Sequence, residues 1–393
     1  MTRAAARRWN GANPTGIDRV CDAYADHFGH RAIAVIQIRG RAVMLNRAAS
    51  DLLMQSLDLP RWQFRRKLVA ALTMSTAAPL RALETRDAYY INVGHSDFDL
   101  DSHWRWVNRS GLKPIYLLHD LIPITDPDVT TTHKTTRHRG RVKSALKHAR
   151  GIVANSQTTA SGLRQFARDN RIGMPPLLVS WIAGAKLPLI RKPEQSATTK
   201  FVSVGTIERR KNPQLLLDVW QEMIALMGEA APRLVFAGSL GSGSEELLAR
   251  LEREPWLARF VDLKTDLDDR SLARLISGAR AVLLPSFAEG YGIPLVEALE
   301  RRIPVIGSNL ASFEELGQGI PTLLDPHDIQ AWAAAVADYC NKGDEYRRQL
   351  AAIDGFVAPQ WSDHFAKLAA WLNMLDNQPD LHTGINRQKA AFA

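Results

Sequence analysis

The second half of the chain alternates short apolar runs with longer segments in which apolar residues recur every three or four positions. The short runs predict strands at 201–204, 233–237, 260–263, 281–284 and 303–306. The longer segments predict helices after Asn212-Pro213, from about 245, near 271–277, at 294–301 and at 329–340. Strands that alternate with helices indicate βαβ units and a parallel sheet, whose ligands bind beyond the carboxyl ends of the strands.

The first half is less regular. It predicts strands at 33–38, 89–93, 115–118 and 151–154. The segment 184–200 is polar, contains two prolines and has no periodicity, so it predicts a linker between domains. We therefore expect an N-terminal domain over 1–184 and a C-terminal domain over 200–356.

The two ends of the chain carry weaker patterns. Residues 361–375 predict a helix, within a closing segment 357–378, and the polar tail 379–393 is expected to be disordered. At the other end, residues 1–12 lack an apolar run and are expected to form a poor strand or to reflect a shortened start.

Length and composition are those of an ordinary globular protein. The 393 residues exceed the usual size of a single core, which supports two domains. No stretch has 18 apolar residues without a charge, so no membrane-spanning helix is predicted, and the Arg-rich start has no secretory apolar run. Cys21 and Cys340 alone do not predict a disulfide framework. A cytoplasmic location is expected.

The net charge of +9 is unevenly divided. Residues 1–190 hold 28 Lys and Arg against 14 Asp and Glu, and the remainder hold 22 against 27. Two segments concentrate the positive charge: 134–150, with seven Lys and Arg and no acid, and 61–67, which mixes cations with aromatic residues. They are either solvated helix faces or surfaces that dock on anionic lipid at the inner face of the cytoplasmic membrane. Nucleic acid is not expected, because no recognised module accompanies the charge.

The loop 205–212 (GTIERRKN) follows one predicted strand and precedes a helix, so it lies at the carboxyl edge of the sheet. There, Arg210 and Lys211 suit a diphosphate, whose charge develops on the leaving group when a glycosidic bond breaks. The loop 285–292 follows another strand, and its glycines let backbone N–H groups approach an anion or a sugar hydroxyl. Glu297, placed in the first turn of the next helix, can accept hydrogen bonds from vicinal ribose hydroxyls.

The run EGYGIPLVE at 289–297 resembles the E-x7-E motif of retaining glycosyltransferases of family 4, also described as glycosyl transferases group 1, of the bacterial surface-polysaccharide type. Further segments match that family in the same order: 13–19 its glycine loop, 119–123 its active-site histidine segment, Asn155-Ser156 its Asn-Ser pair, and 205–212 its phosphate loop. The resemblance covers about residues 13–375. It implies an α/β, GT-B fold: two Rossmann-like domains with a cleft between them and a C-terminal helix that crosses back to the N-terminal domain.

The resemblance also implies roles. The catalytic set would be His119, Arg210, Lys211 and Glu289. The donor-binding set would be Gly205, Thr206, Gly290, Tyr291, Gly292 and Glu297, and the acceptor-side loops would contribute Gly16 and Asp120. The N-terminal domain would bind the acceptor and the C-terminal domain the nucleotide-sugar donor. No metal or other cofactor is expected.

Two departures from the family are visible. Arg302 stands where the family usually has glycine, which costs about 1 kcal/mol if the backbone φ is positive there. The clear apolar strand that normally precedes the glycine loop is missing, which affects the role of Gly16. The D-x-D triplets at 97–101 resemble the metal motif of another glycosyltransferase class, but they are predicted to be a polar loop.

The sequence therefore predicts a retaining, metal-independent hexosyltransferase that moves mannose, rhamnose or glucose from a nucleotide-diphosphate sugar to a saccharide or lipid-linked oligosaccharide in bacterial polysaccharide biosynthesis. Two alternatives stay open. One is a GT-B nucleotide-sugar epimerase, and the other is a non-catalytic sugar-nucleotide-binding subunit that docks on a partner enzyme. The base, the sugar and the acceptor are left open by the sequence.

Overall fold

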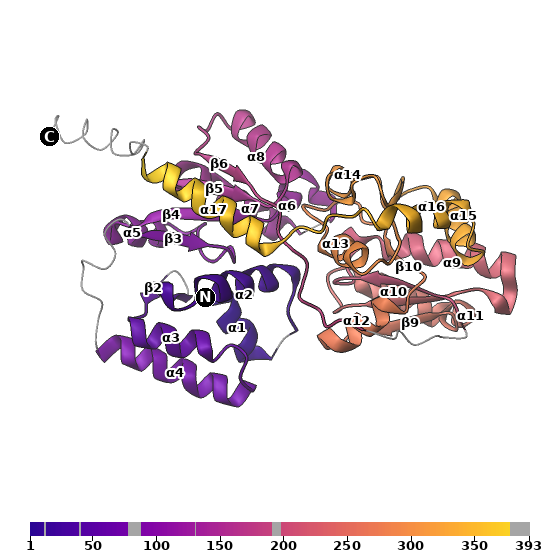
Figure 1. Ribbon diagram of the computed structural model, residues 1–393, viewed down its shortest axis with the longest axis horizontal. Coiled ribbons are helices and arrows are strands. Elements are labelled where there is room, and N and C mark those ends of the chain that lie inside the picture. Colours follow the sequence, from indigo (N-terminus) through magenta and orange to yellow (C-terminus); the bar gives the residue numbers. More distant parts are fainter. Residues whose placement is uncertain (12, 39–40, 78–87, 130, 191–197, 378–393) are drawn as a thin grey trace.

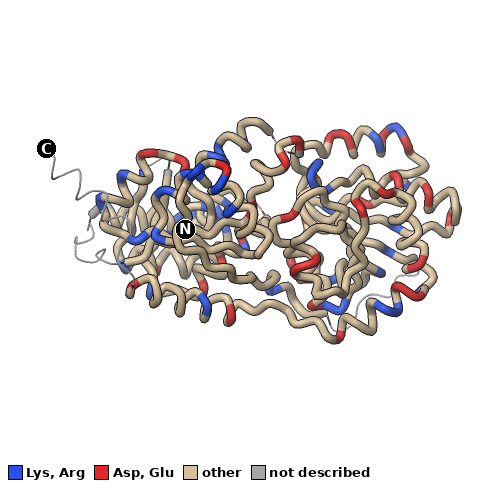
Figure 2. Tube along the Cα trace, turned by 90° about the horizontal axis from the view of Figure 1, so that it is seen from above, with Lys and Arg blue, Asp and Glu red and all other residues tan. Residues whose placement is uncertain are grey.

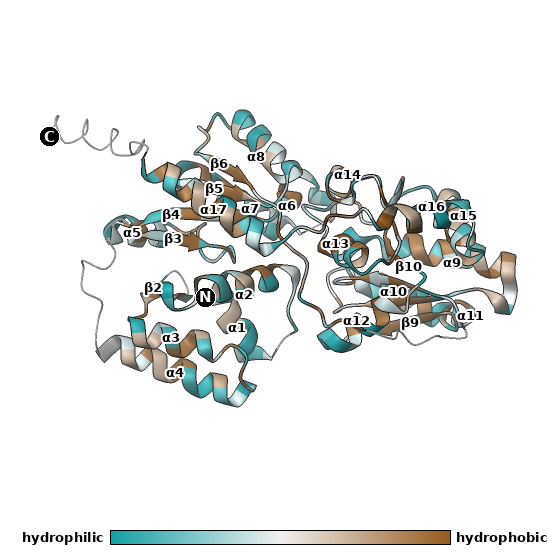
Figure 3. Cartoon of the chain, in the orientation of Figure 1, coloured by the Kyte–Doolittle hydropathy of each residue, from teal (hydrophilic) through white to brown (hydrophobic). Residues whose placement is uncertain are grey.

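The computed structural model describes residues 1–11, 13–38, 41–77, 88–129, 131–190 and 198–377 (Figure 1). Two parallel sheets, each flanked by helices, lie side by side along the long axis of the molecule. Figure 3 shows the hydrophobic colour on strands of both sheets, as expected for strands covered on both faces. No helix in the described ranges combines the length and the apolar character that a membrane span requires.

The C-terminal sheet has six parallel strands in the order β12-β11-β10-β7-β8-β9. The strands are β7 (Lys200–Val204), β8 (Arg233–Ala237), β9 (Val261–Lys264), β10 (Ala281–Leu284), β11 (Val305–Ser308) and β12 (Thr322–Leu324). Their helices are α9 (Pro213–Met227), α10 (Ser244–Arg253), α11 (Pro255–Ala258), α12 (Asp269–Ser277), α13 (Ile293–Glu300), α14 (Ala311–Gly317), α15 (Ile329–Cys340) and α16 (Asp344–Ile353). The predicted parallel sheet is confirmed. Strand β12 was not predicted, because its three residues are too few to form a recognisable apolar run.

The N-terminal sheet has four parallel strands in sequential order, β3-β4-β5-β6. They are β3 (Tyr89–Asn92), β4 (Lys113–Leu118), β5 (Gly151–Ala154) and β6 (Leu177–Val179). A separate antiparallel hairpin holds β1 (Val35–Ile38) and β2 (Arg41–Met44). The strand predicted at 33–38 therefore exists but does not join the parallel sheet. The helices are α1 (Thr2–Asn10), α2 (Gly16–Phe28), α3 (Arg47–Gln55), α4 (Arg61–Ala77), α5 (Asp101–Ser110), α6 (Ile122–Thr125), α7 (Thr132–His148) and α8 (Gln157–Asp169).

The expectation of a poor strand at 1–12 is wrong, because residues Thr2–Asn10 form helix α1. Ala4 and Ala5 are buried in a cluster with residues of α3 and α4, and Gly11 ends the helix with φ 72°. The tail 379–393, for which disorder was expected, lies outside the described residues.

The last helix, α17 (Trp361–Asp376), packs on the N-terminal sheet after the chain has completed the C-terminal sheet (Figure 1). Trp371 and Leu375 lie directly over Gly151, where an added Cβ would be 2.5 Å from the Trp371 ring. The Tyr89 hydroxyl donates to the carbonyl of Leu372 at 3.0 Å. This crossing back of the final helix is the one that the GT-B resemblance implies.

A single apolar cluster joins the two halves. It contains Val20 and Ile115 from the N-terminal part, Val202 and Leu295 from the C-terminal part, and Leu368 from α17. Because the apolar contact is continuous, the loops that follow β4 and β5 face the loops that follow β7 and β10 at short range.

The end of helix α13 meets the condition under which an arginine at position 302 costs backbone energy. Arg302 has φ 61°, and the Ile303 N–H donates to the carbonyl of Ala298 at 2.9 Å, which closes the helix end. The Arg302 side chain is exposed, and its ion pair with Asp354 therefore adds little stability.

We expect Arg302→Gly to stabilise the protein, because glycine adopts positive φ without steric cost. The gain should be about 0.5–1 kcal/mol, or a rise of about 1–3 °C in the melting temperature measured by calorimetry. A fall in melting temperature would mean that the Asp354 ion pair outweighs the backbone strain.

Candidate active site

A cavity of about 520 Å³ lies where the two sheets' carboxyl edges face each other. On the C-terminal side its wall begins at Gly205, which follows β7 with φ 126°. The chain then makes a short 3₁₀ turn, Arg209–Lys211, and enters α9 through Asn212 at φ 51°. The turn brings Lys211 back over Gly205, and both residues line the cavity together with Thr206.

Glu289, which follows β10, joins Arg210 and Lys211 in a buried charge cluster. Arg210 Nη1 lies 3.0 Å from Glu289 Oε2, and Lys211 Nζ is ion-paired with Glu289 Oε1. The Ser286 hydroxyl donates to the same Oε1 at 2.9 Å. Burial alone would raise the pKa of Glu289, but the two cations and these hydrogen bonds hold the pKa at about 2. Glu289 is therefore ionised, and its carboxylate is shared between the two cations.

This arrangement can bind a diphosphate. Arg210 is also paired with Glu208, at 2.8 Å, and donates to the carbonyl of Ala288 at 2.7 Å, so its guanidinium is fixed before any ligand arrives. A preorganised Arg–Lys pair at a sheet edge stabilises negative charge that develops on a leaving group, without reorganising at the moment of reaction.

His119 and Asp120 form the opposite wall, at the end of β4. His119 is buried, and its Nε2 lies 2.8 Å from the carbonyl of Val93, which can only accept, so Nε2 carries the hydrogen. Burial lowers the pKa of His119 to about 4, despite the Val93 carbonyl. The imidazole is therefore neutral near pH 7, with Nδ1 as its acceptor nitrogen. Asp120 accepts a hydrogen bond from the backbone N–H of Ile122 at 3.1 Å.

Gly290 brings the two walls together. An added Cβ at Gly290 would lie 2.5 Å from both Asp120 Cβ and the His119 carbonyl oxygen. Glycine is required here for the close approach of two backbones, and not for a left-handed conformation. Its neighbour Gly292 does have positive φ, 113°, at the start of α13.

Tyr291 lines the cavity, but its side chain is buried in the joint core. Its hydroxyl donates to the carbonyl of Ile182 in the segment between the sheets. The structure thus ties Tyr291 to the connection between the two halves, in addition to the donor role that the resemblance implied.

Glu297 is the fifth residue of α13 and not the fourth as predicted, because the helix begins at Ile293, one residue before the predicted start. Its Oε1 accepts a hydrogen bond from the Ala185 N–H at 2.9 Å. Burial raises the pKa of Glu297 to about 7, against the lowering effects of that hydrogen bond and of the nearby Arg19. Glu297 lines the cavity with Gly16, so both residues border the same space.

Gly16 does not form a glycine loop. It is the first residue of α2, and the Thr15 side chain caps that helix. An added Cβ at Gly16 would be 3.0 Å from the side chain of Ile293, so α2 begins directly against the start of α13. The position at the cavity is as the sequence indicated, and the local structure differs.

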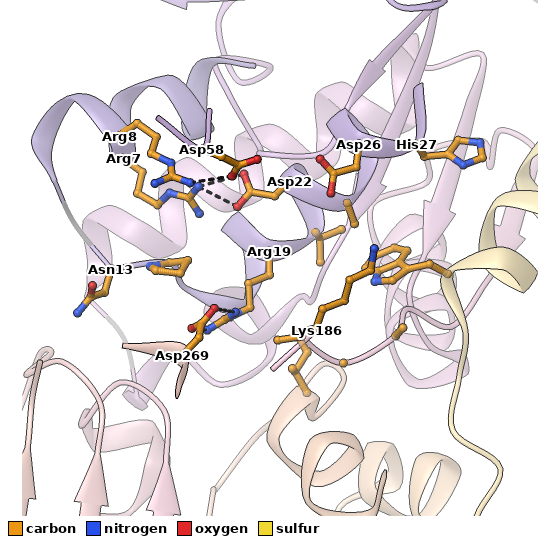
Figure 4. Close-up of a pocket in the computed structure, with 18 of the residues that line it drawn as sticks. Arg7, Arg8, Asn13, Arg19, Asp22, Asp26, His27, Asp58, Lys186 and Asp269 are labelled. Atoms are coloured by element: carbon orange, nitrogen blue, oxygen red, sulfur yellow. Dashed lines mark hydrogen bonds and ion pairs between the residues drawn. The ribbon is translucent and has the colours of Figure 1, made fainter. Parts of the chain in front are cut away.

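The sequence reading missed a contact between the walls. Arg19 from α2 makes two hydrogen bonds with Asp269 at the start of α12, at 2.6 and 3.1 Å (Figure 4). Arg19 and Asp269 line both this cavity and a second, open one of about 850 Å³, which Figure 4 shows. Arg19 ends the segment 13–19 that resembles the glycine loop, but the pairing has no local signal, because the two residues are 250 positions apart.

In the D-x-D triplets, Asp97 and Asp99 are ion-paired, and Asp101 begins helix α5. Asp99 accepts from Arg137 at 2.9 Å and from Arg141 at 3.2 Å, both on α7. This pairing agrees with the predicted polar loop. Within the described ranges, no three His, Cys, Asp or Glu side chains are grouped as metal ligands would be.

Comparison with known proteins gives a family for part of the chain. Residues 189–353 match the family model described as glycosyl transferases group 1. The chain is 24% identical over 229 residues to a serotype-specific mannosyltransferase, WbdA, of Escherichia coli. That match covers 54% of this chain and 28% of the relative. It is 30% identical over 180 residues to the O-antigen chain mannosyltransferase B of Escherichia coli. That match covers 45% of this chain and 45% of the relative. The chain thus spans less than half the length of these relatives.

A longer match exists with a D-inositol 3-phosphate glycosyltransferase of Rhodococcus jostii, at 25% identity over 77% of this chain and 69% of that protein. Among solved structures, a sucrose-phosphate synthase from Thermosynechococcus elongatus covers 92% of both chains with TM-score 0.62 and 16% identity. A trehalose-phosphate synthase from Burkholderia vietnamiensis covers 88% of this chain and 91% of its own, with TM-score 0.58 and 14% identity. The resemblance to group 1 glycosyltransferases and the GT-B fold are confirmed.

Proposed function

We propose that this chain, whose residues 189–353 match the glycosyl transferases group 1, is a retaining glycosyltransferase that moves a hexose from a nucleotide-diphosphate sugar to a saccharide or lipid-linked acceptor. The observation that carries the proposal is the buried cluster of Arg210, Lys211 and Glu289 facing His119 across the cavity. The names of the mannosyltransferase relatives support mannose as the sugar and polysaccharide assembly as the process.

We assign the donor to the C-terminal part, 200–356, and the acceptor to the N-terminal part, 1–184. In the reaction, the bond between the anomeric carbon and the diphosphate oxygen breaks while a bond to the acceptor oxygen forms on the same face. Arg210 and Lys211 stabilise the leaving diphosphate, which takes the proton of the acceptor hydroxyl. Glu289 and the amides of 290–292 hold the sugar, and His119 offers Nδ1 to a sugar hydroxyl. Contact between the walls excludes water and limits hydrolysis of the donor.

The first test is thermal stabilisation of the purified protein by GDP, UDP, dTDP, ADP and CMP, with and without EDTA. We expect one diphosphate to stabilise the protein by several degrees and EDTA to have no effect, because the two cations take the place of a metal. The absence of any stabilisation would contradict the donor site. Loss of stabilisation with EDTA would contradict metal independence.

Two other functions make different predictions. A nucleotide-sugar epimerase would consume the donor without any acceptor. A non-catalytic binding subunit would bind the nucleotide and turn over no sugar with any acceptor. The complete set of Arg210, Lys211, Glu289 and Glu297 around one cavity favours the transferase over the binding subunit.

Donor binding should depend on pH through Glu297. With a pKa of about 7, raised by burial from an ordinary value of 4.5, Glu297 is protonated in acid and ionised above neutrality. Only the carboxylate accepts hydrogen bonds from two ribose hydroxyls, so we expect the donor Kd to fall about 3- to 10-fold between pH 6 and 8. Titration calorimetry should show no such trend for Glu297→Gln.

The same shift affects stability in the opposite direction. Because the folded-state pKa is raised, the stabilisation that comes from proton binding is complete below about pH 4.5 and is lost as the pH rises through 7.

If the donor Kd of the wild type were flat between pH 6 and 8, the ribose role of Glu297 would be contradicted.

We further propose that helix α4 docks the protein on an anionic membrane surface, which would bring the cavity to a lipid-linked acceptor. Figure 2 shows Lys and Arg distributed over the N-terminal half. On α4, which lies along the lower edge of the N-terminal part in Figure 1, Trp62 is 60% and Val69 50% exposed. Arg66 lies between them on the same face, and α4 contains no acid.

The test is cosedimentation with vesicles of phosphatidylglycerol or phosphatidylcholine. We expect binding to phosphatidylglycerol only, and a loss of at least about fivefold in Trp62→Ala/Arg66→Ala. Trp256→Ala is the matched control, because Trp256 is a similarly exposed tryptophan on the C-terminal half. Equal binding of the double variant and the control would contradict this orientation.

A further inference from the structure

The carboxylate of Glu315 caps a helix that belongs to the other half of the molecule. Glu315 lies on α14 of the C-terminal part, and α8 belongs to the N-terminal part. Glu315 Oε1 accepts from the backbone N–H of Gln157 at 2.8 Å, and Oε2 accepts from the N–H of Thr158 at 3.1 Å. A carboxylate at a helix N-terminus satisfies N–H groups that have no partner within the helix and meets the positive end of its dipole.

The same carboxylate also holds the chain where it leaves the N-terminal sheet. The Trp181 indole N–H donates to Glu315 Oε1 at 2.7 Å, two residues after β6. The Thr158 hydroxyl donates to Oε2 at 3.2 Å. Glu315 thus accepts four hydrogen bonds, and all four donors lie across the junction between the two halves.

The N-terminus of α8 also contacts the loop assigned to the donor sugar. The Ser156 hydroxyl donates to the carbonyl of Gly290 at 2.7 Å. The Thr159 hydroxyl lies 3.2 Å from that carbonyl and 3.2 Å from the carbonyl of His119. One helix end therefore connects Glu315, the glycine after Glu289, and the backbone of His119.

We propose that Glu315, Ser156 and Thr159 form an interdomain latch, which closes the cleft and positions the Gly290 loop against His119. The proposal rests on the proposed transferase function and adds positioning residues to it. Glu315 itself does not line the cavity, and its hydrogen bonds go to the start of α8 and to Trp181, so we infer that it acts through these segments. When the cleft opens, the carboxylate and the α8 N–H groups exchange their mutual hydrogen bonds for bonds to water, so opening and closing can both occur in one catalytic cycle.

The latch is tested by Glu315→Gln. The amide keeps the size of the side chain but presents an NH₂ group to one of the two backbone N–H donors. One of the two hydrogen bonds from the backbone of α8 is therefore lost. Glu314→Gln is the matched control, because Glu314 is the preceding residue of the same helix and is exposed. With the sugar nucleotide and acceptor that the wild type uses, we expect kcat of Glu315→Gln to fall at least about tenfold. The ratio of donor hydrolysis to transfer should rise, and the Kd for the nucleoside diphosphate should stay within about threefold.

Two results would overturn the latch. One is a kcat within twofold of the Glu314→Gln control. The other is a loss of kcat accompanied by an equal loss of nucleotide affinity and of melting temperature, which would indicate a purely structural role.

A readout without turnover separates this proposal from the function itself. Small-angle scattering in the presence of the stabilising diphosphate should give a larger radius of gyration for Glu315→Gln than for the wild type and the control. If the wild type turned over no sugar nucleotide, the proposed function would fail. The scattering comparison would still decide the latch, and equal radii would reject it.

Discussion

Lys211→Ala is expected to lower kcat about 10²- to 10³-fold, the size of effect that follows removal of one preorganised donor to a developing negative charge. In the structure Lys211 is paired with Glu289, and the Gly205 backbone lies beside its aliphatic chain. Arg210 remains beside Glu289 in the variant, so the carboxylate keeps one cation and the fold should persist. The measurement is steady-state release of nucleoside diphosphate, with the melting temperature as a check of folding.

Lys264→Ala is the matched control for this variant. Lys264 ends β9, at the carboxyl edge of the same sheet, and is exposed. We expect it to leave kcat within twofold of the wild type. If Lys211→Ala behaved like Lys264→Ala, the leaving-group role of Lys211 would be wrong.

Gly290→Ala is expected to lower kcat about 10²-fold by keeping the two walls of the cavity apart. The new methyl group would lie 2.5 Å from Asp120 Cβ and from the His119 carbonyl, a distance that requires one backbone to move. Gly290 does not have positive φ, so alanine brings no intrinsic backbone strain there. Nucleoside diphosphate affinity should therefore change little, and the loss should appear in kcat measured with saturating donor.

Gly173→Ala provides the control, because an added Cβ at Gly173 would meet no atom within 4 Å. It should retain the wild-type kcat. A Gly290→Ala variant with unchanged kcat would mean that the walls need not touch during the reaction, and it would also weaken the case for the interdomain latch.

The C-terminal part of the fold could be predicted because each signal is local. Strands such as β10, Ala281–Leu284, are fully apolar and are followed at once by a glycine loop and a helix. The same local order places Arg210, Lys211 and Glu289 at one sheet edge, and the structure brings all three together. The resemblance rests on the same short segments.

The remaining features depend on contacts between distant segments. Helix α1 is favoured locally by the alanines and arginines of residues 3–8, which have high helix propensity, but the surface that buries Ala4 and Ala5 lies on α3 and α4. The Arg19–Asp269 pair joins helices α2 and α12, which belong to different halves of the molecule. Glu315 accepts from the first backbone N–H groups of α8, and backbone groups carry no sequence signal. The position of Glu297 in its helix differs from the prediction by one residue, because α13 begins at Ile293, before its proline.

The central claim is sugar transfer with retained configuration, and the most direct measurement is NMR of the product's anomeric centre. The protein would be incubated with the sugar nucleotide whose diphosphate stabilises it and with a lipid-linked oligosaccharide acceptor, in parallel with Lys211→Ala. The account predicts a glycoside with the donor's anomeric configuration, formed only when acceptor is present and lost in Lys211→Ala. An inverted product, or equal consumption of the donor without acceptor, would contradict it.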